Sequence, residues 1–393
     1  MPDASAPHRG QPVLFYADSY RFPDVYHATG FLAPDPFITL DADGEVVVVT
    51  SSLEYGRAEK ESRATTVRNM DDFGLTELSK RGVAGDELAA TICQRFLEDR
   101  RLRRVAVPGH FPIGVADRLR AAGIELIVDN DVPFRRRRKR PDEVAWIEAT
   151  QRATEAAWAA GVAALRRATI SEADGTLAFD GTIFTAERLR AIVETELLGL
   201  GCATPESTIT APGKQAADPH AVGSGPLRPN EAIVMDIYPM HAGTRYYADM
   251  TRTVSKGLPS DEIVKMYEVV KRAQDAGIAA LRPGIIGREV HELVEDVIFE
   301  AGYDTLRPGQ KHDGDGGTPR GFIHGTGHGV GLQIHEAPTI GRGGTKPLEE
   351  GDVVTVEPGI YDPAIGGVRL EDMLVITRGG ARNLTTAPRE LVI

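Results

Sequence analysis

The sequence predicts an α/β protein of two domains, and three observations support this fold class. Its 393 residues exceed what one hydrophobic core usually organises. The first third of the chain alternates strand-like and helix-like segments, as layered α/β domains do. The remainder contains two similar stretches that we interpret as copies of one α-α-β-β unit.

The domain boundary is predicted at the basic run RRRRKRPDE, residues 135–143. Pro141 interrupts any preceding helix and is well suited to begin a new one. We therefore expect an N-terminal domain over residues 1–135 and a second domain over residues 141–393. A phosphate-binding patch is one interpretation of the run, and a solvated linker on an acidic protein is the preferred one.

The N-terminal domain is predicted from three β-rich runs and one long helical pattern. The runs are GEVVVVTS, RRVAVPG and GIELIVD, and the helical pattern is DELAATICQRFLEDRRL. This alternation is typical of an α/β layer. No cluster of reactive side chains is evident in it.

Composition and charge limit the classes of partner. The formal net charge is −12 at pH 7, which argues against nucleic acid and anionic membranes because both select basic surfaces. No apolar run has the length of a membrane span, and the N-terminal residues lack the apolar core of a signal peptide. The two cysteines, Cys93 and Cys202, form no C-x-x-C motif. Small neutral or cationic substrates remain open, and we expect a soluble, cytoplasmic protein.

The predicted duplication places acidic residues at matched positions. AGVAALRR at 160–167 resembles AGIAALRP at 276–283, and each is followed by a second helical pattern and then a β-hairpin. The first hairpin carries Asp236 and Asp249, 13 residues apart, and the second carries Glu357 and Glu371, 14 residues apart. Two facing hairpins would bring these four acids together.

Buried carboxylates in this arrangement would need compensation. Apolar neighbours such as Val234 and Ile237 predict buried strands, where each unpaired carboxylate costs several kcal/mol. Surface acids at strand ends are the alternative, but they do not explain four matched positions. Four carboxylates with one imidazole favour hard ions such as Mn²⁺, Fe²⁺ or Co²⁺, and a pair of such ions is suited to hydrolysis.

The segment HGTGHGVGLQIHEAP, residues 324–338, is expected to complete the site. It contains His324, His328 and His335 among alternating glycines. We expect these glycines to let the backbone approach ions and substrate closely. Val330 stands where a G-x-G-x-x-G motif requires glycine, so the segment is not a dinucleotide fingerprint.

These motifs resemble those of a known family. HGTGHGVGLQIHE, TVEPGIY, GVRLED and MDIYP with ADMTRT resemble the pita-bread (M24) metallopeptidases, closest to their prolidase and aminopeptidase P branch. The resemblance covers essentially the whole chain, since the first 135 residues resemble a creatinase-type N-terminal domain. KRPDEVAWIEATQRA resembles the start of the catalytic domain. The resemblance to this family implies that five residues bind metal: Asp236, Asp249, His328, Glu357 and Glu371.

The resemblance also implies roles for further residues. His335 would transfer a proton or stabilise the intermediate, and Glu357 would serve as both ligand and acid–base group. His220 would position the substrate, and His324 would line the pocket for the leaving proline. Arg369 would contact substrate and hold the ligand carboxylates by charge-assisted hydrogen bonds.

The activity implied by the resemblance is that of a homodimeric, dinuclear-metal exopeptidase. It would hydrolyse the bond before proline in Xaa-Pro dipeptides or Xaa-Pro-Xaa peptides, using a hydroxide that bridges the metals. Manganese is the first expectation for the two divalent ions, with cobalt, iron or zinc as alternatives.

One departure from the family pattern concerns specificity. Similar prolidases carry an arginine after HE-x-P that is thought to bind the dipeptide carboxylate, whereas this chain has Thr339. Arg342, three residues away, could substitute for it. The sequence therefore leaves both dipeptides and longer peptides open as substrates.

Three other functions fit the scaffold. A creatinase-like amidinohydrolase would work without metal, a metal-dependent lyase would keep most ligands, and a non-catalytic peptide-binding module would lose them. The presence of all five ligand types counts against the first and the third.

Overall fold

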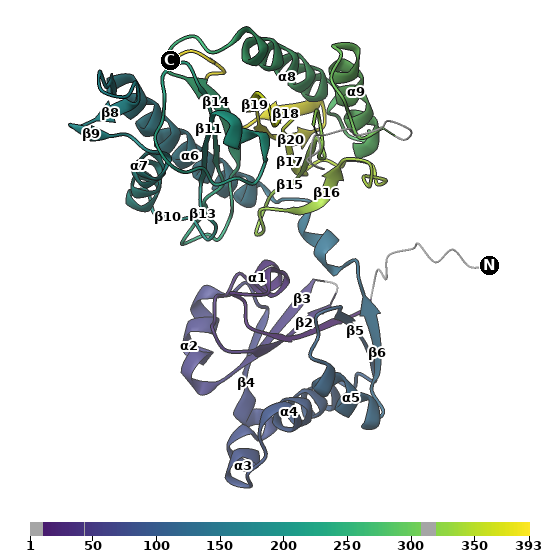
Figure 1. The fold of residues 1–393 in the computed structure, drawn as a ribbon. Coiled ribbons are helices and arrows are strands. Elements are labelled where there is room, and N and C mark those ends of the chain that lie inside the picture. The colour runs from purple at the N-terminus through teal and green to yellow at the C-terminus, as the bar shows by residue number, and fades with distance from the viewer. Residues whose placement is uncertain (1–10, 43, 308–319) are drawn as a thin grey trace. The chain divides into compact units, whose positions relative to one another are not determined.

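The computed structural model describes residues 11–42, 44–307 and 320–393. It confirms the predicted α/β class, and the described chain divides into two compact units, one ending at Arg136 and one spanning Arg137–Ile393 (Figure 1). No helix in the described ranges is long and apolar enough to cross a membrane.

The first unit is built on one six-stranded mixed sheet. Its strand order is β4-β3-β2-β1-β5-β6. β1 and β3 both pair antiparallel with β2, whereas β3–β4, β1–β5 and β5–β6 are parallel. The strands are β1 (Val13–Ala17), β2 (Phe37–Ala42), β3 (Glu45–Thr50), β4 (Thr66–Asn69), β5 (Arg104–Pro108) and β6 (Glu125–Asp129).

The helices of this unit contribute to a core centred on β1, β3 and β5. The near-continuous apolar runs of these strands are buried, as expected for strands covered on both faces. The helices are α1 (Pro23–Thr29), α2 (Ser52–Glu61), α3 (Leu75–Lys80), α4 (Gly85–Asp99) and α5 (Ile113–Ala121), with short 3₁₀ turns η1 (Met70–Phe73) and η2 (Val132–Arg136).

The basic run is not the solvated linker that the sequence predicted. Arg136 is 3% exposed and donates to Asp24 within the first unit, at 2.6 Å. Arg137 is 5% exposed and pairs with the buried Asp352 in the second unit, with 2.8 Å between Nε and Oδ1. Lys139 is also buried and pairs with Glu336. These cations lie far in sequence from their acids, so local composition could not reveal the pairs.

The first helix of the second unit, α6, begins at Pro141, the predicted helix start. The Glu143 side chain accepts a hydrogen bond from the Arg140 backbone N–H at 2.7 Å and so caps the first turn. The helices of this unit pack as two pairs, α6 on α7 and α8 on α9. They are α6 (Pro141–Arg167), α7 (Ala186–Gly199), α8 (Asp261–Ala280) and α9 (Gly287–Glu300), with a 3₁₀ turn η3 (Gly213–Ala217).

Each helix pair is followed by antiparallel strands, as the predicted repeat requires. The first set has the order β11-β12-β14 and the second β16-β15-β17-β20-β21. They comprise β11 (Ile209–Pro212), β12 (Ala232–Ile237), β14 (Met250–Ser255), β15 (Gly327–Gly329), β16 (Glu336–Ile340), β17 (Val353–Val356), β20 (Asp372–Thr377) and β21 (Gly380–Asn383).

Shorter strands complete the unit. β7 (Thr169–Ile170), β8 (Leu177–Phe179) and β9 (Thr182–Ile183) form a small sheet, β10 (Cys202–Ala203) pairs with β13 (Met240–His241), and β18 (Gly359–Asp362) pairs with β19 (Gly366–Arg369).

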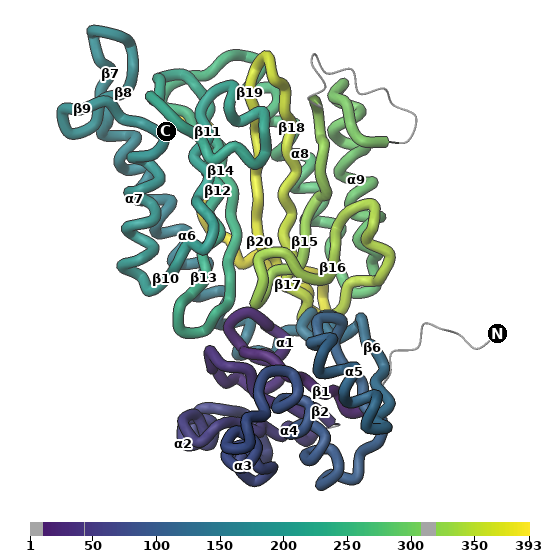
Figure 2. The backbone as a smooth tube through the Cα atoms, turned by 60° about the horizontal axis from the view of Figure 1, so that its bottom comes forward, coloured from purple at the N-terminus to yellow at the C-terminus, as the bar shows by residue number. Residues whose placement is uncertain are grey.

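The two strand sets meet along β14 and the segment that leads into β20. The backbone N–H of Glu371 donates to the Thr251 carbonyl at 3.0 Å, and the Thr253 hydroxyl donates to the Arg369 carbonyl at 2.9 Å. In Figure 2 the strands of the two halves run side by side, with α6 and α7 beside one half and α8 and α9 beside the other. The ends of the acid-bearing strands therefore converge.

Two of the alternating glycines lie where neighbouring segments of chain approach each other closely. A Cβ atom at Gly327 would lie 2.0 Å from the Thr355 carbonyl oxygen, and one at Gly329 would lie 2.3 Å from that of Ala337. The close approach is thus between neighbouring segments of chain. Glycine is required at both positions because these backbones leave no room for a side chain.

Candidate metal centre

A cavity of about 510 Å³ in the second unit contains every candidate site residue. It is lined by Glu206, Ile209, Pro219, His220, Asp236, Tyr238, Asp249, Ile323, His324, Gly325, Gly327, His328, Ile334, His335, Glu357, Arg369 and Glu371. Sequence positions from 206 to 371 thus meet in one place.

Strand ends supply the acids. Asp236 lies on β12, and Asp249 directly precedes β14, which pairs with β12. Glu357 directly follows β17, and Glu371 directly precedes β20, which pairs with β17. Each antiparallel pair therefore contributes two carboxylates at one end, which is the arrangement that the duplicated spacing predicts.

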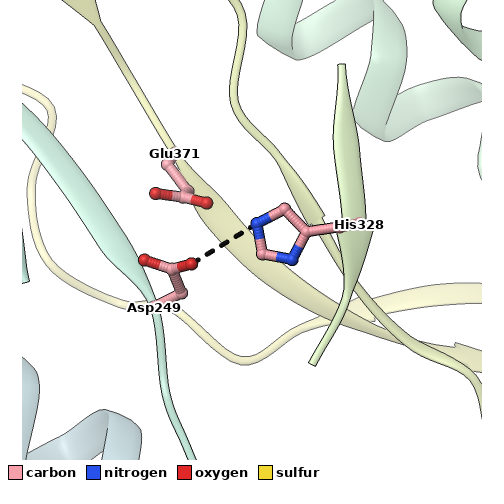
Figure 3. Close-up of side chains that lie close together, drawn as sticks. All are labelled: Asp249, His328 and Glu371. Atoms are coloured by element: carbon pink, nitrogen blue, oxygen red, sulfur yellow. Dashed lines mark ion pairs between the residues drawn. The ribbon is translucent and has the colours of Figure 1, made fainter. Parts of the chain in front are cut away.

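Three donors are close enough to share one ion. One ligand atom each from Asp249, His328 and Glu371 lies within 4.8 Å of the other two (Figure 3). His328 Nε2 is 3.5 Å from Asp249 Oδ2 and 3.4 Å from Glu357 Oε1. The imidazole on β15 thus faces one acid from each half of the unit.

The carboxylates are held in an environment that opposes their ionisation. Burial, reinforced by the charges of neighbouring acids, raises the pKa of Asp249 and of Glu371 well above the usual range. Burial raises the pKa of Glu357 to about 8, with Arg369 opposing the shift. Burial and the nearby His335 lower the pKa of His328 to about 3. The imidazole is therefore neutral at pH 7, the form that binds metal.

Two carboxylate oxygens without hydrogen-bond partners also indicate a metal site. Asp249 Oδ1 and Glu371 Oε1 are buried and have no hydrogen-bond partner among the described residues. Buried carboxylate oxygens are rarely left unpaired because each costs about 1–3 kcal/mol. A divalent cation would satisfy both, so the residues present fit a metal site.

Arg369 organises the other side of the acid cluster. Its Nη2 donates to Asp236 Oδ2 at 2.7 Å, and its Nη1 lies 3.1 Å from the Tyr361 hydroxyl and 3.3 Å from the Pro219 carbonyl. The Thr251 hydroxyl lies 2.8 Å from Asp236 Oδ1 and 2.9 Å from Glu371 Oε2. These contacts fix the orientation of two candidate ligands.

The three remaining histidines line the cavity at different depths. His220 and His335 are solvent-exposed, and the ring of His335 stands edge-on to His328 with 4.2 Å between ring centroids. His324 is half-buried, and its Nε2 lies 2.8 Å from the Tyr361 hydroxyl. Burial lowers the pKa of His335, and burial together with Arg369 lowers the pKa of His324 to about 3.

Sequence reasoning missed several residues that line this cavity, and also Tyr361, which lies outside the lining but contacts two of its residues. Tyr361 belongs to the motif TVEPGIY, yet its contacts with Arg369 and His324 could not be inferred from that motif. Tyr238 and Glu206 lie in segments where no pattern marked them. Their presence in the cavity depends on the packing of α7, β11 and β12.

The proposed substitute for a carboxylate-binding arginine lies elsewhere. Arg342 pairs with Glu295, with 2.5 Å between Nη2 and Oε1, and it does not line the cavity. Thr339 lies on β16, opposite His328 in the β15–β16 register, and it is absent from the lining too.

Comparisons with known proteins identify the family of the chain. The sequence model of metallopeptidase family M24 matches residues 145–378. An uncharacterized peptidase of Bacillus subtilis, YqhT, is 41% identical over 186 residues, which are 47% of this chain and 48% of that protein. An Xaa-Pro dipeptidase of Lactobacillus helveticus is 40% identical over 190 residues, 47% of this chain and 46% of that protein. The chain thus matches about half the length of these curated relatives.

Solved structures match nearly the whole chain. An X-Pro aminopeptidase from Thermotoga maritima, 24% identical, has a TM-score of 0.78 and covers 98% of this chain and 97% of its own. The prolidase from Pyrococcus horikoshii, 27% identical, has a TM-score of 0.73 with coverages of 98% and 96%. These matches confirm the predicted pita-bread fold class.

Proposed function

Because the chain belongs to metallopeptidase family M24, we propose that it is a metal-dependent exopeptidase that hydrolyses the bond before proline in Xaa-Pro peptides. One observation carries the proposal: four carboxylates and a neutral imidazole from both halves of the second unit meet in one cavity. The Xaa-Pro dipeptidases among its relatives support this substrate class.

Asp236, Asp249, His328, Glu357 and Glu371 would hold two divalent cations. Manganese is the first choice, with cobalt, iron or zinc as alternatives, because carboxylate oxygens outnumber nitrogen donors and no thiolate lines the cavity. When bound, such a pair would polarise the scissile carbonyl and lower the pKa of a water molecule.

The residues of the chain would position the peptide and move protons. Glu357, whose Oε1 lies 3.4 Å from His328 Nε2, would also relay a proton to the leaving nitrogen. His335 at the exposed side of the cavity would donate a hydrogen bond to the developing oxyanion, and His220 would orient the peptide there.

His324 and Arg369 have supporting roles in this proposal. Held by Tyr361, His324 would form the wall against which the proline ring packs. Arg369 would keep Asp236 oriented, and it would lie near the bound peptide as part of the cavity wall.

The wider context of the enzyme is proposed from the family resemblance. Residues 1–135 would be a creatinase-type domain and residues 141–393 the catalytic domain, and the active form would be a homodimer. A cytoplasmic location agrees with Cys93 and Cys202, which are both free thiols. Light scattering of the purified protein would test the homodimer.

A peptidase assay tests the central proposal. Purified protein loaded with Mn²⁺ should hydrolyse Ala-Pro amide or Ala-Pro-Ala, and a chelator should abolish this activity. Asp249→Ala should be inactive, whereas the matched variant Asp35→Ala, at an exposed acid of the first unit, should keep full activity. Undiminished hydrolysis by Asp249→Ala would contradict the proposal, because the cleavage would then not need this candidate metal ligand.

A further inference from the structure

Glu206 is a charged residue of the cavity that the proposed chemistry does not use. Its side chain is exposed and lines the cavity, and no ion pair or hydrogen bond to it is seen among the described residues. Two hydrogen bonds anchor the residues that directly follow it. The Tyr238 hydroxyl donates to the Ser207 carbonyl at 2.8 Å, and the Thr208 N–H donates to Glu194 at 3.2 Å.

The charge of Glu206 reaches the reactive part of the cavity. Burial lowers the pKa of His335, and the Glu206 carboxylate partly opposes that shift. Burial raises the pKa of Tyr247, and Glu206 adds to that increase. Glu206 and His335, both exposed, line the same cavity as the candidate metal ligands.

The cavity has a buried end and an exposed end. Asp249, Arg369 and Glu371 are buried, whereas Glu206, His220 and His335 are exposed. A peptide bound by its amine and scissile carbonyl at the buried end would extend its C-terminal side towards the exposed end. Because consecutive Cα atoms are about 3.8 Å apart, a group directly after the proline would lie close to this opening.

No cation among the described lining residues is free to receive a carboxylate there. Arg369 is the only lysine or arginine of that lining, and it is buried against Asp236, Tyr361 and Pro219. Arg342 is paired with Glu295 outside the cavity. A free proline carboxylate would therefore meet an uncompensated negative charge.

We propose that Glu206 is a specificity-determining residue that disfavours a free carboxylate directly after the proline. The inference rests on the proposed peptidase function and narrows its substrates. The site prefers Xaa-Pro peptides whose proline carboxyl group is blocked by an amide or a further residue, and it cleaves Xaa-Pro dipeptides less efficiently.

The test compares Ala-Pro with Ala-Pro amide, which differ mainly in the terminal charge. The Mn²⁺-loaded wild type should have a higher kcat/KM for the amide. Glu206→Gln should reduce the ratio of kcat/KM for Ala-Pro amide to kcat/KM for Ala-Pro roughly two- to fivefold, through a lower KM for Ala-Pro. This is the range expected for two charges about 4–8 Å apart near water. Glu206→Lys should reduce this kcat/KM ratio further, because it reverses the charge. Added salt should weaken the wild-type preference because Glu206 is exposed.

Glu300→Gln, which removes an exposed carboxylate from α9 outside the cavity lining, is the matched control and should keep the wild-type ratio. A wild type that prefers Ala-Pro, or a ratio unchanged in Glu206→Gln, would overturn the inference.

A binding measurement separates this inference from the proposed function. Proline and prolinamide cannot be cleaved, so their affinities can be compared by titration calorimetry without turnover. Prolinamide should bind more tightly to the wild type, and Glu206→Gln should reduce the difference. Cleavage of neither peptide would refute the proposed function, while equal affinities of these two ligands in wild type and variant would refute the role of Glu206.

Discussion

The guanidinium of Arg369 lies 2.7 Å from the carboxylate of Asp236, measured from Nη2 to Oδ2, and this ion pair joins the second half of the second unit to the first half. Both groups line the cavity, and the arginine is 4% exposed. The geometry of the candidate ligands thus depends on a residue that would not itself bind metal.

Arg369→Lys should weaken metal binding and activity although it keeps the positive charge. A lysine cannot contact Asp236, Tyr361 and the Pro219 carbonyl in the same planar arrangement. Losses of outer contacts to metal ligands typically reduce metal affinity or activity by about 10- to 100-fold. Titration with Mn²⁺ and peptide hydrolysis would measure both effects. Arg378→Lys, at an arginine that is 90% exposed, is the control, and equal behaviour of the two variants would be inconsistent with the proposed support.

Asp249→Asn should stabilise the metal-free protein and remove its response to metal. The buried carboxylate has an unpartnered oxygen and neighbouring acids that raise its pKa, so its charge opposes folding at pH 7. We expect the free energy of unfolding of the metal-free variant to exceed that of the wild type by about 1–3 kcal/mol. Urea unfolding with and without Mn²⁺ would show this. If Asp249→Asn is less stable than the wild type without metal, and Mn²⁺ still stabilises it, Asp249 is not a metal ligand.

His291 on α9 should make the protein sensitive to acid. Its side chain is buried, with Nδ1 2.9 Å from the Thr326 hydroxyl, and burial together with Arg342 and Arg307 lowers its pKa from 6.5 to about 4. The unfolded chain therefore binds a proton first as the pH falls. Stability should decline between about pH 6.5 and pH 4, by up to about 3 kcal/mol from this residue.

His291→Gln keeps a polar group near Thr326 and cannot titrate in this range. The difference in unfolding free energy between wild type and variant should therefore shrink as the pH falls from 7 to 4. Parallel pH profiles of the two proteins in urea unfolding would show that His291 does not carry this dependence.

Gly327→Ala should destabilise the protein although it adds only one methyl group. The new Cβ atom would lie 2.0 Å from the backbone oxygen of Thr355, which cannot move aside as a flexible side chain could. We expect a loss of about 1–3 kcal/mol and weaker Mn²⁺ binding, because the adjacent His328 would shift. At Gly343 an added Cβ would meet nothing within 4 Å, so Gly343→Ala should change stability by less than about 0.5 kcal/mol. Similar unfolding midpoints for the two variants would disprove this difference.

The acid cluster could be predicted because the four acids occupy matched positions in two similar stretches of the sequence. Asp236 and Asp249 bracket one hairpin and Glu357 and Glu371 another, so matched spacing alone indicated convergence. The structure brings all four acids into one cavity.

Other features depend on contacts between distant segments and were not predictable. The pairing of Arg137 with Asp352 buries a cation that its basic neighbours suggested would be solvated. The contacts of Tyr361 and the position of Glu206 depend likewise on how strands pack. Alternating glycines correctly indicated close approach, but a pattern of small residues does not reveal which neighbour approaches.

The candidate ligands come from opposite halves of the second unit, since Asp249 directly precedes β14 and Glu371 directly precedes β20. A growing polypeptide cannot offer the complete donor set until Glu371 has emerged from the ribosome and β20 has docked against the first half. Ion capture would then follow, rather than guide, the docking of the two halves.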